Sequence, residues 1–266
     1  MLSENKINYG GKVTLFLGNK HAAMRKSRFT EYDLNRSFGY GVKNNPSYER
    51  GRAEEIMSIL ETADVFIDFH QTMRPSQFPF YIFSMHEESY YWAQAAGVAK
   101  AFITRKPGSQ FSDAGMCSDE FMRASLNKVG ITLELGEQGF HKDAENYTKI
   151  VILRSLKNMN KIQKGYTTIK RLARKNCSFE FFETRYREPF KHPKKKLKEG
   201  FCNFDYIQRG DCIGEDEEGK PLFSKETGYI LFPKYPATYD QIQTMPLSGE
   251  LFVLAQKLNI HPLIWC

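Results

Sequence analysis

The segment RFTEYDLNRSF, which begins at Arg28, contains two arginines and an asparagine within nine residues. Arg28 and Arg36 carry guanidinium groups, which bind carboxylates through paired hydrogen bonds, and Asn35 adds a side-chain amide. A loop with these side chains is suited to binding a carboxylate of a small molecule. The structural alternative is that both arginines lie at the surface and pair with Glu31 and Asp33.

Two apolar segments carry, at or near their ends, residues that can act on a proton or a metal ion. VFIDFH ends at His70, whose neutral imidazole can bind zinc, and Asp68 precedes it by two residues, a spacing that can orient the ring. Glu134 interrupts the apolar segment TLELG, where a carboxylate is costly to bury unless it is paired or functional. Beside a metal it can take a proton from bound water. The structural alternatives are a hydrogen-bonded strand-end histidine and a salt-bridged glutamate.

The segments around these residues predict the fold class. Short apolar runs alternate with amphipathic ones up to about residue 165, which is typical of an α/β sheet buried between helices. We expect strands over residues 13–19, 65–70, 78–84 and 130–136, and helices over residues 48–63, 87–101, 117–128 and 143–164.

The pattern changes after residue 165. Short β-rich pieces are separated by glycines at positions 200, 210, 214, 219 and 228. We therefore predict an α/β domain over residues 1–165 and a smaller β domain over residues 166–266.

Composition excludes several classes of protein. The 266 residues contain no apolar run of about 18 residues, which predicts no membrane-spanning helix. The first residues, MLSENKINYGGK, have no apolar core, so we expect no signal peptide and a cytoplasmic location. The net charge of +7 comes largely from residues 161–175 and 191–198, without interleaved aromatics, so we expect no nucleic-acid partner. The five cysteines lack a CxxC pair, which indicates neither disulfides nor a zinc knuckle.

Five motifs occur in one order along the chain: GNKHA at 18–22, RFTEYDLNRSF at 28–38, YERGRAEEI at 48–56, DFHQT at 68–72 and TLELG at 132–136. Together they resemble the aspartoacylase/succinylglutamate desuccinylase family. DLNR, with Arg28 five residues before Asp33, is the most specific element, and GYILFPK at 228–234 matches more loosely. The resemblance implies a zinc-carboxypeptidase-like fold, a mixed α/β sheet flanked by helices, followed by a smaller C-terminal β domain.

The resemblance also implies roles for individual residues. His70 resembles the third zinc ligand, and Glu134 resembles the general base. Arg28 resembles the arginine that stabilises the polarised carbonyl, whereas Asn35 and Arg36 resemble the residues that bind the substrate carboxylate. The implied reaction is zinc-dependent hydrolysis of an amide bond in an N-acyl amino acid or a similar carboxylate-bearing substrate.

Two further assignments rest on looser matches. Arg123, eleven residues before Glu134, is a candidate for another carboxylate-binding arginine. A tyrosine of the β domain closes the site in the family, and Tyr235 or Tyr239 is the candidate here.

The chain departs from the family pattern at its beginning. The family places two zinc ligands in a His-Gly-Asn-Glu motif before the GN-x-x-A segment, but residues 1–9 contain no histidine, and His21 falls inside the GNKHA loop. We therefore expect this chain to bind zinc poorly, and we expect an exposed sheet edge that favours homo-oligomers. The alternative function is a catalytically inactive remnant that acts as a binding or scaffold protein. A basic adaptor for nucleic acid is a third hypothesis.

Overall fold

The computed structural model describes residues 9–40, 46–106, 111–112, 115–173, 179–235 and 249–259. The helices in these residues are α1 (Lys20–Met24), the 3-10 helix η1 (Leu34–Arg36), α2 (Tyr48–Glu61), α3 (Glu87–Ala96), α4 (Ser118–Ala124), α5 (Lys142–Gln163) and α6 (Ile169–Ala173). The strands are β1 (Val65–Thr72), β2 (Phe80–Ile82), β3 (Ala101–Thr104), β4 (Val129–Glu137), β5 (Glu180–Pro189), β6 (Lys196–Leu197), β7 (Tyr206–Ile207), β8 (Cys212–Glu215), β9 (Pro221–Phe223), β10 (Gly228–Leu231) and β11 (Glu250–Leu258). None of these helices is long and apolar enough to cross a membrane.

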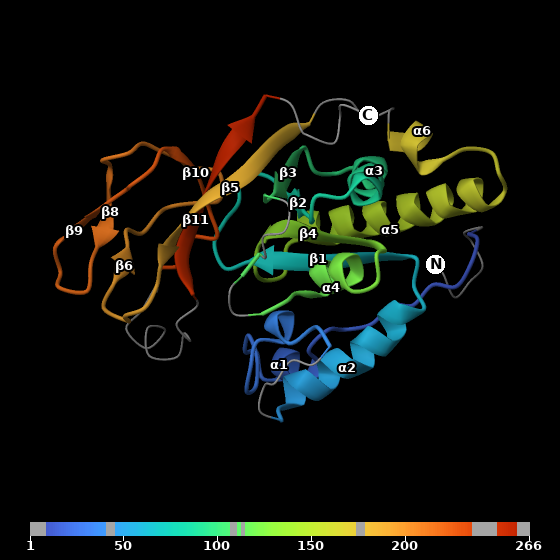
Figure 1. Cartoon of the computed structure of the whole chain (residues 1–266), viewed down its shortest axis with the longest axis horizontal. Coiled ribbons are helices and arrows are strands. Elements are labelled where there is room, and N and C mark those ends of the chain that lie inside the picture. Colours follow the sequence, from blue (N-terminus) through green and yellow to red (C-terminus); the bar gives the residue numbers. More distant parts are fainter. Residues whose placement is uncertain are drawn as a thin grey trace.

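One eight-stranded sheet extends through the molecule in the order β1-β4-β2-β3-β5-β11-β10-β7 (Figure 1). The sheet is mixed, because β1 and β4 are parallel, β4 and β2 are antiparallel, and β2 and β3 are parallel. Among the described strands, β1 pairs with β4 alone and so forms one edge of the sheet. The mixed α/β sheet flanked by helices that the sequence predicts is confirmed.

Helices cover both faces of the α/β part of the sheet. α3 and α5 pack on one face, where Ile131 and Leu133 of β4 meet Trp92 and Val151 in one buried cluster. α2 and α4 pack on the other face (Figure 1), where Phe66 of β1 packs against the buried side chains of both helices. Successive strand side chains point to opposite faces, so Asp68, His70 and Glu134 share the face of α4.

The contact between α4 and the sheet is very close at Gly130 in β4. A Cβ atom at this position would lie 2.6 Å from the backbone oxygen of Asp119 and 2.8 Å from Cβ of Met122. The absence of a side chain therefore lets the first turn of α4 lie directly on the strand that carries Glu134.

The β-rich C-terminal region continues the main sheet. β5 lies parallel to β3 and antiparallel to β11, so it joins the two halves of the sheet. A separate three-stranded sheet has the order β6-β8-β9. Phe80 of β2 packs against Phe204, with ring centroids 5.0 Å apart, which fixes the C-terminal region against the same face of the sheet as α4. The domain boundary at residue 165 stays a prediction.

Two secondary-structure predictions are wrong. Residues 13–19 form no strand: the backbone oxygens of Leu17 and Gly18 accept hydrogen bonds from the Arg52 side chain of α2, and Leu15 is 64% exposed. The helix expected over residues 87–101 ends at Ala96, because Gly97 takes a φ of 70° and β3 begins four residues later at Ala101.

Candidate active site

The last residues of β1 and β4 lie side by side and bring His70 to Glu134. The two residues are Cα partners in the parallel register, and Nδ1 of His70 lies 4.0 Å from Oε1 of Glu134. On the other side of the ring, Nε2 of His70 lies 3.0 Å from Oδ2 of Asp68. The imidazole is therefore held between two carboxylates.

Burial and charge shift the protonation of this cluster. The Glu134 side chain is only 7% exposed, and burial raises the pKa of its carboxyl to about 7, although the His70 charge acts in the opposite direction. Burial alone would lower the pKa of His70, but Asp68, followed by Glu134, raises it to about 10. The Oε2 atom of Glu134 has no hydrogen-bond partner in the described structure. A buried carboxyl whose pKa lies near neutrality, with an unused oxygen, is suited to accept a proton.

The N-terminus of α4 connects the cluster of Asp68, His70 and Glu134 to the loop of residues 28–38, which carries Arg28 and Arg36 and is called the arginine-bearing loop. The Ser118 hydroxyl donates to Oδ2 of Asp68 at 2.8 Å, and the Ser118 backbone N–H donates to Oδ1 of Asn35 at 3.4 Å. Beside it, Asp119 is 3% exposed, its Oδ2 atom lacks a hydrogen-bond partner, and burial raises its pKa.

The arginine-bearing loop is held by its own aspartate. Arg28 donates from Nε and Nη2 to Oδ2 of Asp33, at 3.2 and 2.8 Å. Burial acts to raise the pKa of Asp33, but Arg28 and Arg36 outweigh it and lower that pKa. Nη1 of Arg36 donates to the Asn35 backbone oxygen at 2.7 Å, and its guanidinium lies 5.8 Å from the Phe111 ring centroid.

The structure brings together most of the residues that the sequence predicts. Asn35 reaches the His70 cluster through Ser118, and Arg28 is among the charges that lower the pKa of Glu134. The structure does not bring Arg123 to this cluster, because Arg123 lies in the last turn of α4 and donates to Asn127.

The tyrosine assignments have different outcomes. Tyr239 lies outside the described residues. Tyr235 lies beyond the end of β1, where its ring centroid is 4.0 Å from the Arg74 guanidinium and its backbone oxygen accepts from Arg74.

Sequence reasoning missed Ser118 and Lys234. Lys234 is 7% exposed and donates to Oε1 and the backbone oxygen of Glu250, both at 2.8 Å. Burial lowers the pKa of Lys234, and Arg28 and Arg36 contribute to that shift, so the three cations lie in one neighbourhood. The only sequence signal for Lys234 was its place at the end of GYILFPK.

A three-ligand zinc site does not fit the side chains that the structure describes. No group of three or more His, Cys, Asp or Glu residues among them is arranged to hold a metal ion. His70 is the one imidazole in contact with Asp68 and Glu134, so these side chains provide at most one nitrogen ligand. His21 stacks on Tyr48 of α2, with ring centroids 4.1 Å apart.

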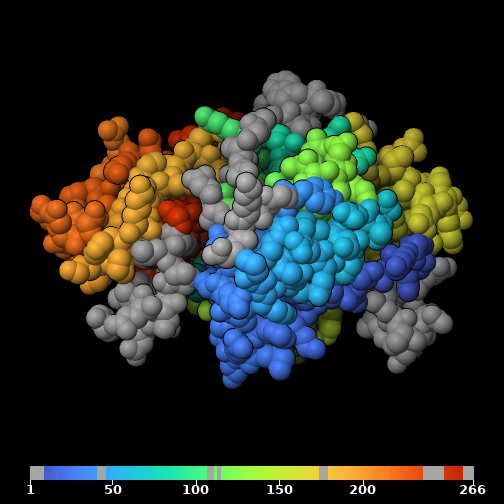
Figure 2. Space-filling view, turned by 60° about the horizontal axis from the view of Figure 1, so that its bottom comes forward, coloured from blue at the N-terminus to red at the C-terminus, as the bar shows by residue number. Residues whose placement is uncertain are grey.

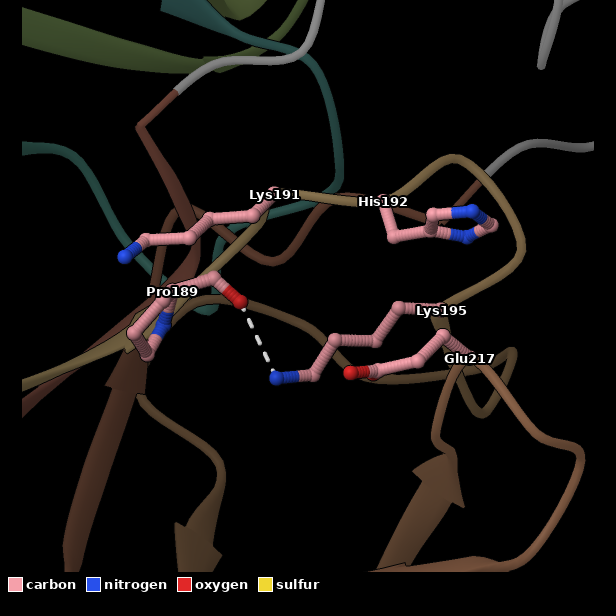
Figure 3. A pocket seen from close by; sticks show the side chains of 5 residues that line it. All are labelled: Pro189, Lys191, His192, Lys195 and Glu217. Atoms are coloured by element: carbon pink, nitrogen blue, oxygen red, sulfur yellow. Dashed lines mark hydrogen bonds between the residues drawn. The ribbon is translucent and has the colours of Figure 1, made fainter.

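A separate cavity of about 180 Å³ lies in the C-terminal region, lined by Pro189, Lys191, His192, Lys195 and Glu217 (Figure 3). Lys195 donates to the Pro189 backbone oxygen and to the buried Glu188 carboxylate. The cavity contains none of the predicted site residues.

Comparison with known proteins agrees with this arrangement. A model of the succinylglutamate desuccinylase/aspartoacylase catalytic domain family matches residues 2–159 of the 266. The chain therefore belongs to the succinylglutamate desuccinylase/aspartoacylase family.

Solved structures show the same fold at low sequence identity. Succinylglutamate desuccinylase from Vibrio parahaemolyticus is similar with a TM-score of 0.66 at 16% identity, over 92% of this chain and 71% of that one. Succinylglutamate desuccinylase from Vibrio cholerae has a TM-score of 0.63 at 20% identity, and the match covers 91% of this chain and 70% of that one. Murine aminoacylase 3 has a TM-score of 0.59 at 17% identity, and the match covers 91% of this chain and 82% of that one. The predicted zinc-carboxypeptidase-like deacylase fold is therefore confirmed.

Proposed function

We propose that this chain hydrolyses the amide bond of an N-acyl amino acid or a similar carboxylate-bearing substrate. The observation that supports the proposal most is the position of the buried Glu134 carboxyl. It lies on the same face of the sheet as the loop that carries Arg28 and Arg36, and its pKa is about 7. A proton acceptor and a carboxylate-binding loop are the two parts that such a hydrolysis requires.

In the proposed reaction, Glu134 takes a proton from the water that attacks the amide carbon. The tetrahedral oxyanion that forms is stabilised by the charge of Arg28, which Asp33 orients through two of its five N–H groups. Glu134 then gives the proton to the leaving nitrogen as the carbon–nitrogen bond breaks. The products are a carboxylate and an amine.

Arg36 and Asn35 are proposed to bind the carboxylate of the substrate. Phe111 packs against the Arg36 guanidinium, and the Asn35 backbone oxygen accepts from it, so the arginine has a defined direction. Its remaining N–H groups suit the paired geometry of a carboxylate.

Zinc dependence is general in the family, but among the described residues no group of three ligands is arranged to hold a metal ion, so the proposed steps use only side chains of the protein. This observation favours a second function, a carboxylate-binding protein without catalysis.

A cytoplasmic location is also part of the proposal, supported by the free cysteines Cys117, Cys202 and Cys212.

The test is a hydrolysis assay on a panel of N-acyl amino acids, with and without added zinc, followed by liberated amine. Turnover of at least one member, abolished by Glu134→Gln, is the expected result. Binding of the same compounds by calorimetry without turnover would establish the second function in place of the first. If none of these compounds is bound or hydrolysed, both proposed functions are refuted.

A further inference from the structure

The loop that carries the carboxylate-binding residues has little regular structure to hold it. Between the end of α1 and residue 40, η1 is the only helix or strand, and it spans three residues. Figure 2 shows this N-terminal segment in blue at the front of the molecule, where it forms part of the surface. The directions of Arg28 and Arg36 must therefore be set by contacts other than a strand ladder or a long helix.

Glu49, in the first turn of α2, supplies those contacts. Its Oε1 atom accepts from the Thr30 backbone N–H at 2.6 Å, the Thr30 hydroxyl at 2.7 Å and the Asn19 side-chain amide at 2.9 Å. Its Oε2 atom accepts from the backbone N–H groups of Glu31 and Tyr32, both at 3.2 Å. Glu49 is 0% exposed, so water does not replace these bonds.

Three consecutive backbone N–H groups that converge on one carboxylate form a concave anion-binding geometry. In this chain the protein's own side chain occupies that geometry, and the charge also lies at the N-terminal end of α2, where negative charge is favourable. The same helix turn holds the far side of the loop, because Nη1 of Arg50 donates to the Ser37 backbone oxygen at 2.7 Å. Residues 30–37 are thus fixed to the first turn of α2 at both ends.

We propose that Glu49 is a positioning residue, which fixes the backbone of residues 30–32 and thereby directs Asn35 and Arg36 at the substrate carboxylate. The inference rests on the proposed function for its assay. Glu49 is not needed to cap α2, because the Ser47 hydroxyl already accepts from the Arg50 backbone N–H.

The assay compares the N-acyl amino acid that the wild-type protein hydrolyses best with its C-terminal amide, which lacks the carboxylate. The quantity measured is kcat/KM for the carboxylate-bearing substrate divided by kcat/KM for its amide. Loss of folded protein lowers both values equally and leaves the ratio unchanged, so the ratio reports positioning alone. Glu49→Gln keeps the size of the side chain but removes one of two acceptor oxygens, and we expect the ratio to fall at least about 10-fold.

The dependence on Arg36 is tested by a double-mutant cycle. In an Arg36→Ala background, Glu49→Gln should change the ratio by less than about 2-fold, because the charged group that Glu49 positions is gone and Asn35 contributes only a neutral hydrogen bond. Thr30→Ala removes one donor to Glu49 and is the milder variant if Glu49→Gln folds poorly, with an expected fall of about 2- to 5-fold. The matched control is Glu55→Gln on the same helix, where a 68% exposed glutamate pairs with Arg52, and the ratio should not change.

A second readout does not depend on turnover. Backbone hydrogen exchange at Thr30, Glu31 and Tyr32 should be at least about 10-fold faster in Glu49→Gln, with β4 unaffected. Unchanged exchange at these amides, or an unchanged ratio, would overturn the proposal. A wild-type protein without turnover on the whole panel would instead refute the proposed hydrolysis, and hydrogen exchange would still decide whether Glu49 sets the loop.

Discussion

Protonation of Glu49 should destabilise the fold in a defined pH window. Burial of this carboxylate acts to raise its pKa, but the hydrogen bonds from Thr30, Asn19 and Tyr32 outweigh burial and lower the pKa from 4.5 to about 2. That difference corresponds to about 3 kcal/mol of folding free energy at neutral pH. Because the folded-state pKa is the lower one, the contribution is complete above pH 4.5 and is lost as the pH falls toward 2.

The measurement is the free energy of unfolding by urea for the wild-type protein and for Glu49→Gln as a function of pH. Trp92, which is 6% exposed, provides a fluorescence signal of unfolding. The difference in the free energy of unfolding between the wild-type protein and Glu49→Gln should decrease by about 2 kcal/mol from pH 6 to pH 3. Glu55→Gln, at an exposed position of the same helix, should show no comparable narrowing. A difference between wild type and Glu49→Gln that stays constant over this range would refute the reasoning, because it would mean that folding does not favour the ionised carboxylate.

Three further predictions concern the proposed reaction. Glu134→Gln removes the proton acceptor and should lower kcat by at least about 100-fold, and a variant with near-normal kcat would end the assignment of Glu134 as the general base. Arg36→Ala should lower kcat/KM about 10- to 150-fold for the carboxylate-bearing substrate but little for its amide, and equal losses on both would make Arg36 structural. The purified 266-residue protein, dialysed and subjected to elemental analysis, should hold well under one zinc per chain, since the described residues contain no three-ligand group. Stoichiometric zinc would contradict this, and His21 would be the first residue to substitute.

The positions of His70 and Glu134 near the carboxyl ends of β1 and β4 were predictable from the sequence. Apolar runs of strand length that end in a histidine or enclose a single carboxylate can be recognised without a structure, because a charged group in such a run is costly to bury unless it has a role. The order of the motifs was equally visible, and it predicted the family to which the chain belongs. The strand predicted over residues 13–19 was wrong, because the conformation of this apolar segment depends on a partner elsewhere in the chain. The backbone oxygens of Leu17 and Gly18 accept hydrogen bonds from the Arg52 side chain of α2.

The network that joins the site could not be predicted, because its contacts are set by packing between distant segments. Ser118 meets Asp68 across 50 residues, and Lys234 shares a neighbourhood with Arg28 and Arg36 only because the C-terminal strands extend the same sheet. A side chain such as Glu49 gives no sign in the sequence that its five donors come from residues 17 to 30 positions away. Local patterns thus determined which residues can do chemistry, whereas tertiary packing decided which of them meet and how the surrounding charges shift their protonation.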